Sequence, residues 1–217
     1  MATEIILIRH AQASFGAGDY DRLSALGREQ ARALGQALKR QGVAPEAAFI
    51  GAQRRHRETW EGLGFDLAPQ VHEGLNEFDF HGLLAAFFRD RPEPEGLWED
   101  RRSHFRALRD AALAWQAGEI AAPPESWEGF CARVEAAREA MAAAGSAVLA
   151  VSSGGAIAQM LRAALEAPPA QMIRLQLQMK NAAVSRLLVT RSGLHLTGFN
   201  ETPHIDAANA ARLLTYS

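Results

Sequence analysis

The chain has 217 residues, the length of one ordinary domain, and its 23 basic and 25 acidic residues give a formal net charge of −2. A chain of this length can bury enough surface to fold without disulfides or a structural metal. The balanced charge gives no sign of a nucleic-acid partner, and no apolar run approaches the length of a membrane span. The opening apolar run is too short for a signal peptide, so we expect a cytoplasmic protein with no membrane partner.

Short apolar runs and helical spacing alternate along the chain. Three runs are typical of strands buried on both faces, at residues 4–9, 47–50 and 147–151. Apolar residues at helical spacing predict helices around residues 25–41, 53–63, 97–117, 127–144 and 155–165. Cys131, the one cysteine, is predicted to be a small buried residue on a helix. Residues 183–190 and 194–199, which are split by Arg191-Ser192-Gly193, are predicted to form a β-hairpin.

This alternation predicts an α/β fold, a three-layer α/β/α sandwich with a mostly parallel central sheet. Residues 78–130 are polar and aromatic, and they contain Pro-Glu-Pro at 92–94 and Pro-Pro at 123–124. We interpret this region as a helical insertion that folds over one end of the sheet as a lid. The whole chain, residues 1–217, is then a single domain.

Polar residues follow the first three predicted strands. Arg9 and His10 come directly after the first strand, a basic cluster at 54–57 follows the second, and Ser-Ser-Gly-Gly at 152–155 follows the third. Ligands of such sheets bind beyond the carboxyl ends of the strands. A helix N-terminus attracts anions, arginines donate to phosphate in a planar fork, and a histidine with a free ring nitrogen can be a nucleophile. The sequence therefore predicts a phosphate site with an embedded histidine.

The residues around this predicted site resemble a known family. LIRHAQAS at 7–14, followed by LSALGREQARALG at 23–35, is similar to the opening motifs of the histidine phosphatase superfamily, also called the phosphoglycerate-mutase-like family. Further segments resemble later motifs of that family in the same order, namely GAQRRHRET at 51–59, GLNEFDFHG at 74–82, VSSGG at 151–155 and FNETPHI at 199–205. The resemblance spans nearly the whole chain and implies a phosphoglycerate-mutase-like fold.

The resemblance also implies roles for individual residues. His10 would attack the substrate phosphorus and carry the phosphoryl group until water removes it. Arg9 and Arg55 would hold the equatorial oxygens, and Glu77 would protonate the leaving oxygen. Asp79 is an alternative for the acid. The arginines neutralise the charge, so neither a metal nor a cofactor is implied.

Other residues are predicted to contact the substrate or to lie apart from it. Gln12, Ser14, Ser153 and Gly154 are candidates for substrate binding, and we expect the pocket to accept a phosphate or sulfate ion. Helical spacing places Arg54 and Arg57 on a solvated face. His204 matches a family histidine that has no catalytic role, so we interpret it as structural.

The chain departs from the family pattern at three positions. Ala11 replaces the glycine after the first histidine, His56 replaces the usual alanine after the second arginine, and Ser153 stands where the family has its second catalytic histidine. Ser153 is open to two interpretations that are compatible, a helix N-cap and a neutral donor to a phosphate oxygen. A serine nucleophile is disfavoured because Gly-x-Ser-x-Gly is absent, Val151 taking the first glycine position. Loss of one donor to the transition state typically costs about 2.7–4 kcal/mol, part of which a hydroxyl recovers.

These observations lead to a primary hypothesis and to alternatives. The primary hypothesis is a phosphatase that hydrolyses a phosphomonoester through a phosphohistidine on His10, and that is slow or selective because of Ser153. The substrate is a small phosphorylated molecule or a phosphoprotein. The main alternative, from another class, is a weak or inactive pseudo-enzyme that binds a phosphorylated ligand or partner. A mutase is disfavoured because it must protect a phosphoenzyme from water. Retention of Glu77 favours chemistry over binding alone.

Overall fold

The computed structural model describes residues 2–14 and 21–216, and its described strands form one central sheet of mixed direction. The sheet order is β3-β2-β4-β1-β5-β6. The strands are β1 (Thr3–Arg9), β2 (Ala47–Ile50), β3 (Gln70–Val71), β4 (Ala147–Ser152), β5 (Val184–Thr190) and β6 (Gly193–Glu201). The first four in the sheet order are parallel, whereas β5 and β6 are antiparallel additions at one edge. The predicted strands, the hairpin and the mostly parallel sheet are therefore confirmed.

The helices connect these strands and add a separate group at one end. They are α1 (Ala25–Arg40), α2 (Arg54–Leu63), α3 (Phe80–Phe88), α4 (Arg101–Gln116), α5 (Trp127–Ala143), α6 (Gly154–Ala164), α7 (Gln171–Gln176) and α8 (Ala210–Leu213), with a 3-10 turn η1 (Glu73–Leu75). The sequence did not predict α3, α7 or α8. Among the described residues, no helix combines the length and apolar character that a bilayer span needs.

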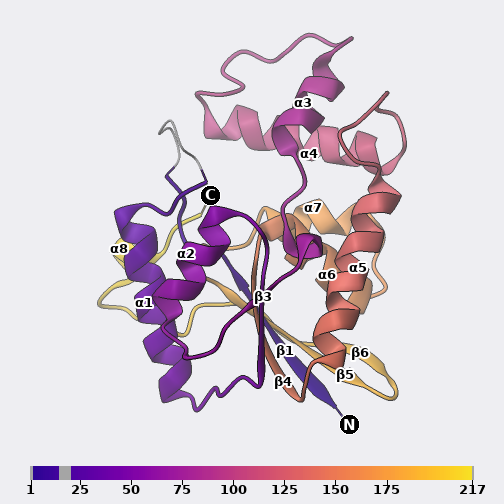
Figure 1. Ribbon diagram of the computed structural model, residues 1–217. Coiled ribbons are helices and arrows are strands. Elements are labelled where there is room, and N and C mark those ends of the chain that lie inside the picture. The colour runs from indigo at the N-terminus through magenta and orange to yellow at the C-terminus, as the bar shows by residue number, and fades with distance from the viewer. Residues whose placement is uncertain (1, 15–20, 217) are drawn as a thin grey trace.

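Two layers of helices cover the two faces of the sheet (Figure 1). Successive side chains of a strand point to opposite faces. Ile5 and Leu7 of β1 therefore join the core beneath α5 and α6. Ile6 and Ile8 join the core beneath α1 and α2 on the other face. Burial of each such side chain contributes roughly 1.5–3 kcal/mol, which fixes β1 and the residues that follow it.

The α3 and α4 helices stand beyond the end of the sheet at which β1 finishes (Figure 1). Aromatic rings packed at tilted angles join this region to α5. The ring centroids of Phe78 and Trp115 lie 5.3 Å apart, and those of Trp115 and Phe130 lie 5.4 Å apart. The helices α3 and α4 of residues 78–130 thus lie at one end of the sheet, while the action of this region as a lid stays a prediction. Cys131 on α5 is half-buried, and burial raises the pKa of its thiol to about 11.

The start of α1 is fixed against the loop that leaves β1. Ser24 caps the helix by accepting a hydrogen bond from the Gly27 amide at 2.9 Å, as its sequence position indicates. The Ser24 amide donates to the carbonyl of Gln12 at 2.9 Å. A Cβ on Gly27 would lie 2.1 Å from that carbonyl oxygen, so only glycine allows this approach. The contact holds the segment just after His10.

Candidate functional site

The first site residues are placed by the two central parallel strands. Arg9 ends β1, paired with Ser152 of β4, and the amide of His10 donates to the Ser152 carbonyl at 2.9 Å. The amide of Ala182 donates to the carbonyl of His10 at 3.3 Å. Backbone bonds therefore hold His10 from both sides, and only 4% of its surface is exposed.

The imidazole of His10 is oriented by its own neighbour in the chain. Its Nδ1 lies 2.9 Å from the carbonyl oxygen of Ala11. A carbonyl oxygen only accepts, so Nδ1 carries the hydrogen and Nε2 keeps a lone pair. Burial, followed by the charges of Arg55 and Arg9, lowers the pKa of His10 well below its usual value. The ring is therefore neutral at pH 7 with an unprotonated Nε2, and its role as a nucleophile stays a prediction.

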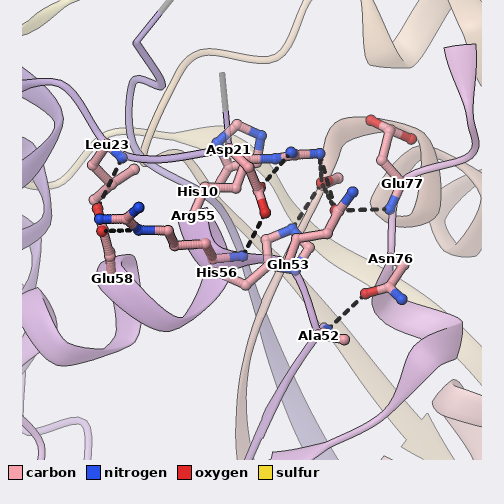
Figure 2. Close-up of polar contacts among 12 residues, drawn as sticks. His10, Asp21, Leu23, Ala52, Gln53, Arg55, His56, Glu58, Asn76 and Glu77 are labelled. Atoms are coloured by element: carbon pink, nitrogen blue, oxygen red, sulfur yellow. Dashed lines mark hydrogen bonds and ion pairs between the residues drawn. The ribbon is translucent and has the colours of Figure 1, made fainter. Parts of the chain in front are cut away.

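Arg55 points from α2 into the same region, where polar groups of the described residues accept from it (Figure 2). It donates to Asp21 at 2.8 Å, to Oε1 of Gln53 at 2.9 Å and to Oγ of Ser153 at 3.4 Å. Gln53 Oε1 also accepts from the amide of Glu77 at 3.2 Å, which links α2 to the segment before α3. The side chain of Arg55 is buried with its guanidinium already oriented, as a phosphate clamp requires.

The two flanking arginines of the basic cluster lie elsewhere. Arg54 and Arg57 are exposed, and Arg54 forms an ion pair with Glu58 at 2.7 Å. This confirms the prediction that helical spacing turns them away from Arg55. Arg9, by contrast, is buried and donates through Nη1 to the carbonyl of Met179.

Glu77 reaches the site from the segment between η1 and α3. Both of its carboxylate oxygens accept from the amide of Gly155 at 3.1 Å, and Nε2 of Gln176 lies 3.4 Å from Oε2. A Cβ on Gly155 would lie 2.2 Å from Oε1, so the second glycine of the turn makes room for the carboxylate. Burial raises the pKa of Glu77, opposed by the Gly155 amide and the nearby arginines. A raised pKa suits a group that must deliver a proton.

The alternative carboxylate, Asp79, is engaged in a structural contact. Its Oδ1 accepts from the amide of Gly82 at 2.9 Å and so caps α3. The side chain is exposed to solvent. Of the two acids that the sequence left open, Glu77 is the one that the structure brings to Arg9, His10 and Arg55.

Ser153 occupies the N-cap position of α6, but its hydroxyl does not cap the helix. The interpretation of its side chain as a cap is therefore wrong. Oγ lies 2.8 Å from Nε2 of His56 and 3.3 Å from Oε1 of Gln53, and the residue is fully buried. A buried imidazole at hydrogen-bond distance takes the hydroxyl away from the helix amides, and the Gly155 amide donates to Glu77 instead.

His56 is the residue whose part sequence reasoning missed. It is fully buried on α2, and its ring centroid lies 5.8 Å from that of His10. A Cβ on Gly51 would lie 2.2 Å from Nδ1 of His56, so the imidazole fits only because residue 51 has no side chain. Burial, followed by the charge of Arg55, lowers its pKa well below the usual value, while the Gly51 backbone raises it. The signal was in the sequence, since a histidine absent at Ser153 is matched by one gained at 56.

The remaining predicted substrate contacts lie around this centre. Gln12 Oε1 accepts from the Ser24 hydroxyl at 2.7 Å, and the Ser14 amide donates to the carbonyl of Arg22 at 2.9 Å. Gly154 begins α6, and a Cβ there would lie 3.5 Å from Nε of Arg9. Gly154 is thus next to the arginine, whereas Gln12 and Ser14 are occupied by local contacts. Substrate binding by these three residues stays a prediction.

Charge in this pocket is supplied by arginine. Within residues 2–14 and 21–216, no three His, Cys, Asp or Glu side chains are grouped as metal ligands would be. Arg9 and Arg55 are buried beside His10 and act on its pKa. They place two cationic side chains next to the imidazole, and the binding of a phosphoryl group by these arginines stays a prediction.

Comparison with known proteins finds one matching family model and a related enzyme. The model of the histidine phosphatase superfamily (branch 1) matches residues 5–202. A 2,3-bisphosphoglycerate-dependent phosphoglycerate mutase from Methylobacterium radiotolerans is 34% identical over 144 residues, which are 60% of this chain and 62% of the mutase. The chain thus spans less than two thirds of the length of that relative.

Solved structures share the fold over almost the whole chain. A phosphoserine phosphatase mutant from Entamoeba histolytica, in complex with phosphoserine, has a TM-score of 0.67 at 18% identity, covering 94% of this chain and 100% of that one. A mycobacterial glucosyl-3-phosphoglycerate phosphatase with inorganic phosphate has a TM-score of 0.64 at 23% identity, covering 94% and 100%. At such identities the likeness establishes the common fold.

Proposed function

Because the chain belongs to the histidine phosphatase superfamily, we propose that it hydrolyses a phosphomonoester through a phosphohistidine formed on His10. Phosphatases and a mutase are among the relatives, which supports an enzyme of this superfamily. The observation that carries the proposal is the orientation of His10, whose Nδ1 bonds to the Ala11 carbonyl at 2.9 Å. Nε2 is thereby left as an uncharged nucleophile beside two arginines.

In the first step, the lone pair on Nε2 of His10 forms a bond to phosphorus while the bond from phosphorus to the leaving oxygen breaks. Arg9 and Arg55 hold the equatorial oxygens, where negative charge is spread in the transition state. Glu77 gives its proton to the leaving oxygen, so the product alcohol departs neutral. The raised pKa of Glu77 supports this role, because burial favours the protonated carboxyl that a general acid needs.

In the second step, water attacks the phosphohistidine. The bond between phosphorus and Nε2 breaks, and the electron pair returns to the ring of His10. Glu77, now a carboxylate, takes the proton of the attacking water. Inorganic phosphate leaves, and both residues regain their starting states. The neighbours bound to phosphoserine and to inorganic phosphate support a small phosphorylated ligand for this pocket.

The test is hydrolysis of p-nitrophenyl phosphate by the wild-type protein and by His10→Ala. We expect His10→Ala to lower kcat/KM by at least about 10³-fold, because the nucleophile is lost. His195→Ala is the matched control, since this histidine is exposed on β6. Intact-mass measurement under alkaline quench should show a phosphoryl adduct on wild type and none on His10→Ala. Equal rates for wild type and His10→Ala would contradict the proposal.

The pseudo-enzyme alternative has one observation in its favour, the hydroxyl of Ser153 where the family motif has an imidazole. A binder would take up inorganic phosphate in a calorimeter and show no turnover that depends on His10. A mutase would return phosphate to a second hydroxyl of the substrate instead of releasing it. Measurement of free phosphate beside the total product separates these outcomes.

A further inference from the structure

Two departures from the family pattern meet in space. Ser153 replaces a histidine and His56 replaces an alanine, although 97 positions separate them. Nε2 of His56 lies 2.8 Å from Oγ of Ser153, and both residues are fully buried. Gly51 provides the space, since a Cβ there would lie 2.2 Å from Nδ1 of the imidazole. A histidine placed on the surface by chance would need neither a serine at position 153, nor a buried position of its own, nor a glycine at position 51.

We propose that Ser153 and His56 act as one unit, in which the Ser153 hydroxyl contacts the phosphoryl oxygen and His56, behind it, orients the hydroxyl and takes up a proton when phosphate binds. The inference rests on the proposed function, because it explains how the site replaces the positive charge of the histidine that the family has at position 153. Ser153 would touch the substrate. His56 would be a positioning residue that acts through Ser153.

The geometry of the hydroxyl explains why a proton is needed. A hydroxyl has one hydrogen, and Oγ of Ser153 has two acceptors within reach, Nε2 of His56 at 2.8 Å and Oε1 of Gln53 at 3.3 Å. While Nε2 is unprotonated, it competes with the ligand for that hydrogen. Once His56 is protonated, Nε2–H donates to Oγ, and the serine hydrogen is free to point at a phosphoryl oxygen.

The proton balance depends on the form of phosphate that binds. A monoanion passes its P–O–H proton to Oγ of Ser153 while the serine proton moves to Nε2 of His56. One O–H bond of phosphate and one of serine break, and one O–H bond of serine and one N–H bond of His56 form. A dianion instead draws the proton from solvent through the same chain. Both routes end with dianionic phosphate, a donating serine and an imidazolium.

The charges around His56 favour its protonation only when phosphate is bound. Arg55, which precedes it on α2, repels an imidazolium, and the ring of His10 from the end of β1 lies 5.8 Å away. Ser153 from α6 and the Gly51 backbone complete its polar surroundings. Burial and Arg55 therefore keep His56 neutral in the empty pocket, consistent with its lowered pKa. A dianion brings two negative charges to the same place and reverses the balance.

The primary experiment measures protons taken up when inorganic phosphate binds. Calorimetric titrations at pH 8, in two buffers of different ionisation enthalpy, give the number of protons bound per site. Wild type should take up more protons than His56→Gln, whose amide can hydrogen-bond but cannot be protonated. His104→Gln is the matched control, since it removes a buried histidine of α4 whose pKa burial also lowers. Equal uptake by wild type and His56→Gln would overturn the proposal.

Turnover provides a second measurement through a double-mutant cycle. Ser153→Ala and His56→Ala should each lower kcat/KM by about tenfold to a hundredfold, and the double variant should be no worse than either. Ser153→Thr keeps the hydroxyl and should retain most of the activity. Additive losses would show that the two residues act separately and would refute the pair.

A further test moves the imidazole from position 56 to position 153. Ser153→His alone should not raise activity, because the ring of His56 fills the space beside Oγ. Ser153→His combined with His56→Ala should exceed His56→Ala alone, because it moves the imidazole to the phosphate. If no variant turns over and His10→Ala is no different from wild type, the phosphatase function fails. In that case, the proton uptake on phosphate binding still tests whether Ser153 and His56 act as one unit.

Discussion

The pocket at the ends of β1 and β4 and the α3–α4 region differ in how they hold charge. In the pocket, cationic side chains are buried, as with Arg55, which is bonded to Asp21, Gln53 and Ser153. On α4 the arginines are exposed, and with Phe105 and Leu177 they line an open hollow, namely Arg101, Arg102, Arg106 and Arg109. The first arrangement fixes one geometry among hydrogen-bond partners, whereas the second keeps its cationic side chains exposed to solvent.

The two regions are adjacent along α7 and the segment that follows it. Gln176 reaches the carboxylate of Glu77 at 3.4 Å, and Leu177, the next residue, lines the arginine hollow. This difference separates the residues suited to the chemical step from those suited to the choice of substrate. Under the proposed function, we expect the chemistry common to any phosphomonoester to depend on the buried residues, and the choice among leaving groups to depend on the exposed basic surface.

The largest effect that tests this division is expected at Glu77, where the two regions meet. Glu77→Gln keeps the shape but removes the transferable proton, and it should lower kcat by about 10²–10⁴-fold for alkyl phosphates. The loss should be smaller for p-nitrophenyl phosphate, whose leaving group needs little protonation. Asp79→Asn, which alters the cap of α3, is the control. Equal losses for both substrates would contradict a role as general acid.

A smaller effect is expected on stability, from the buried histidines. Burial lowers the pKa of His204 to about 4, and His10 and His56 shift in the same direction. The unfolded chain, with a histidine pKa near 6.5, therefore binds more protons in acid. Stability should be fully present above about pH 6.5 and fall as the pH decreases toward 4.

His204→Leu isolates the share of one residue in this pH dependence. The shift to about 4 corresponds to about 3 kcal/mol of unfolding free energy lost between pH 7 and pH 4. Urea unfolding across that range should show a flatter pH dependence for His204→Leu than for wild type. Identical pH dependences would show that His204 is protonated without cost in the folded protein. His195→Leu, at an exposed position, supplies the control.

The sequence predicted the parts of this molecule that local patterns determine. The apolar run at 47–50 became β2 with the same bounds, and the helix predicted around 127–144 became α5 (Trp127–Ala143). The α3 segment, FHGLLAAFF, was missed because His81 is its one polar side chain, which leaves no alternation to mark a helical period. Its helix depends on burial against neighbouring aromatics, which no local pattern encodes.

The site divides in the same way. His10 and Arg55 were singled out by the resemblance to family motifs, and the structure brings both together as buried neighbours. The hydroxyl of Ser153 was misassigned as a cap, because the group that competes for it lies on another helix. His56 was visible only as a departure from a pattern. Its partner became evident when the fold brought the end of β4 next to α2.

The smallest predicted effect concerns the exposed arginines and the choice of substrate. Arg102→Gln with Arg106→Gln should raise KM by up to about tenfold for a phosphomonoester whose leaving group carries a second negative charge, and only at low salt. The kcat value should not change, and KM for p-nitrophenyl phosphate should stay the same. Arg32→Gln with Arg40→Gln makes the same change of charge on exposed positions of α1. If that control pair has the same effect, net charge alone guides the substrate. If only the α4 pair acts, the hollow beside Leu177 receives the leaving group, and the buried pocket supplies the chemistry independently of it.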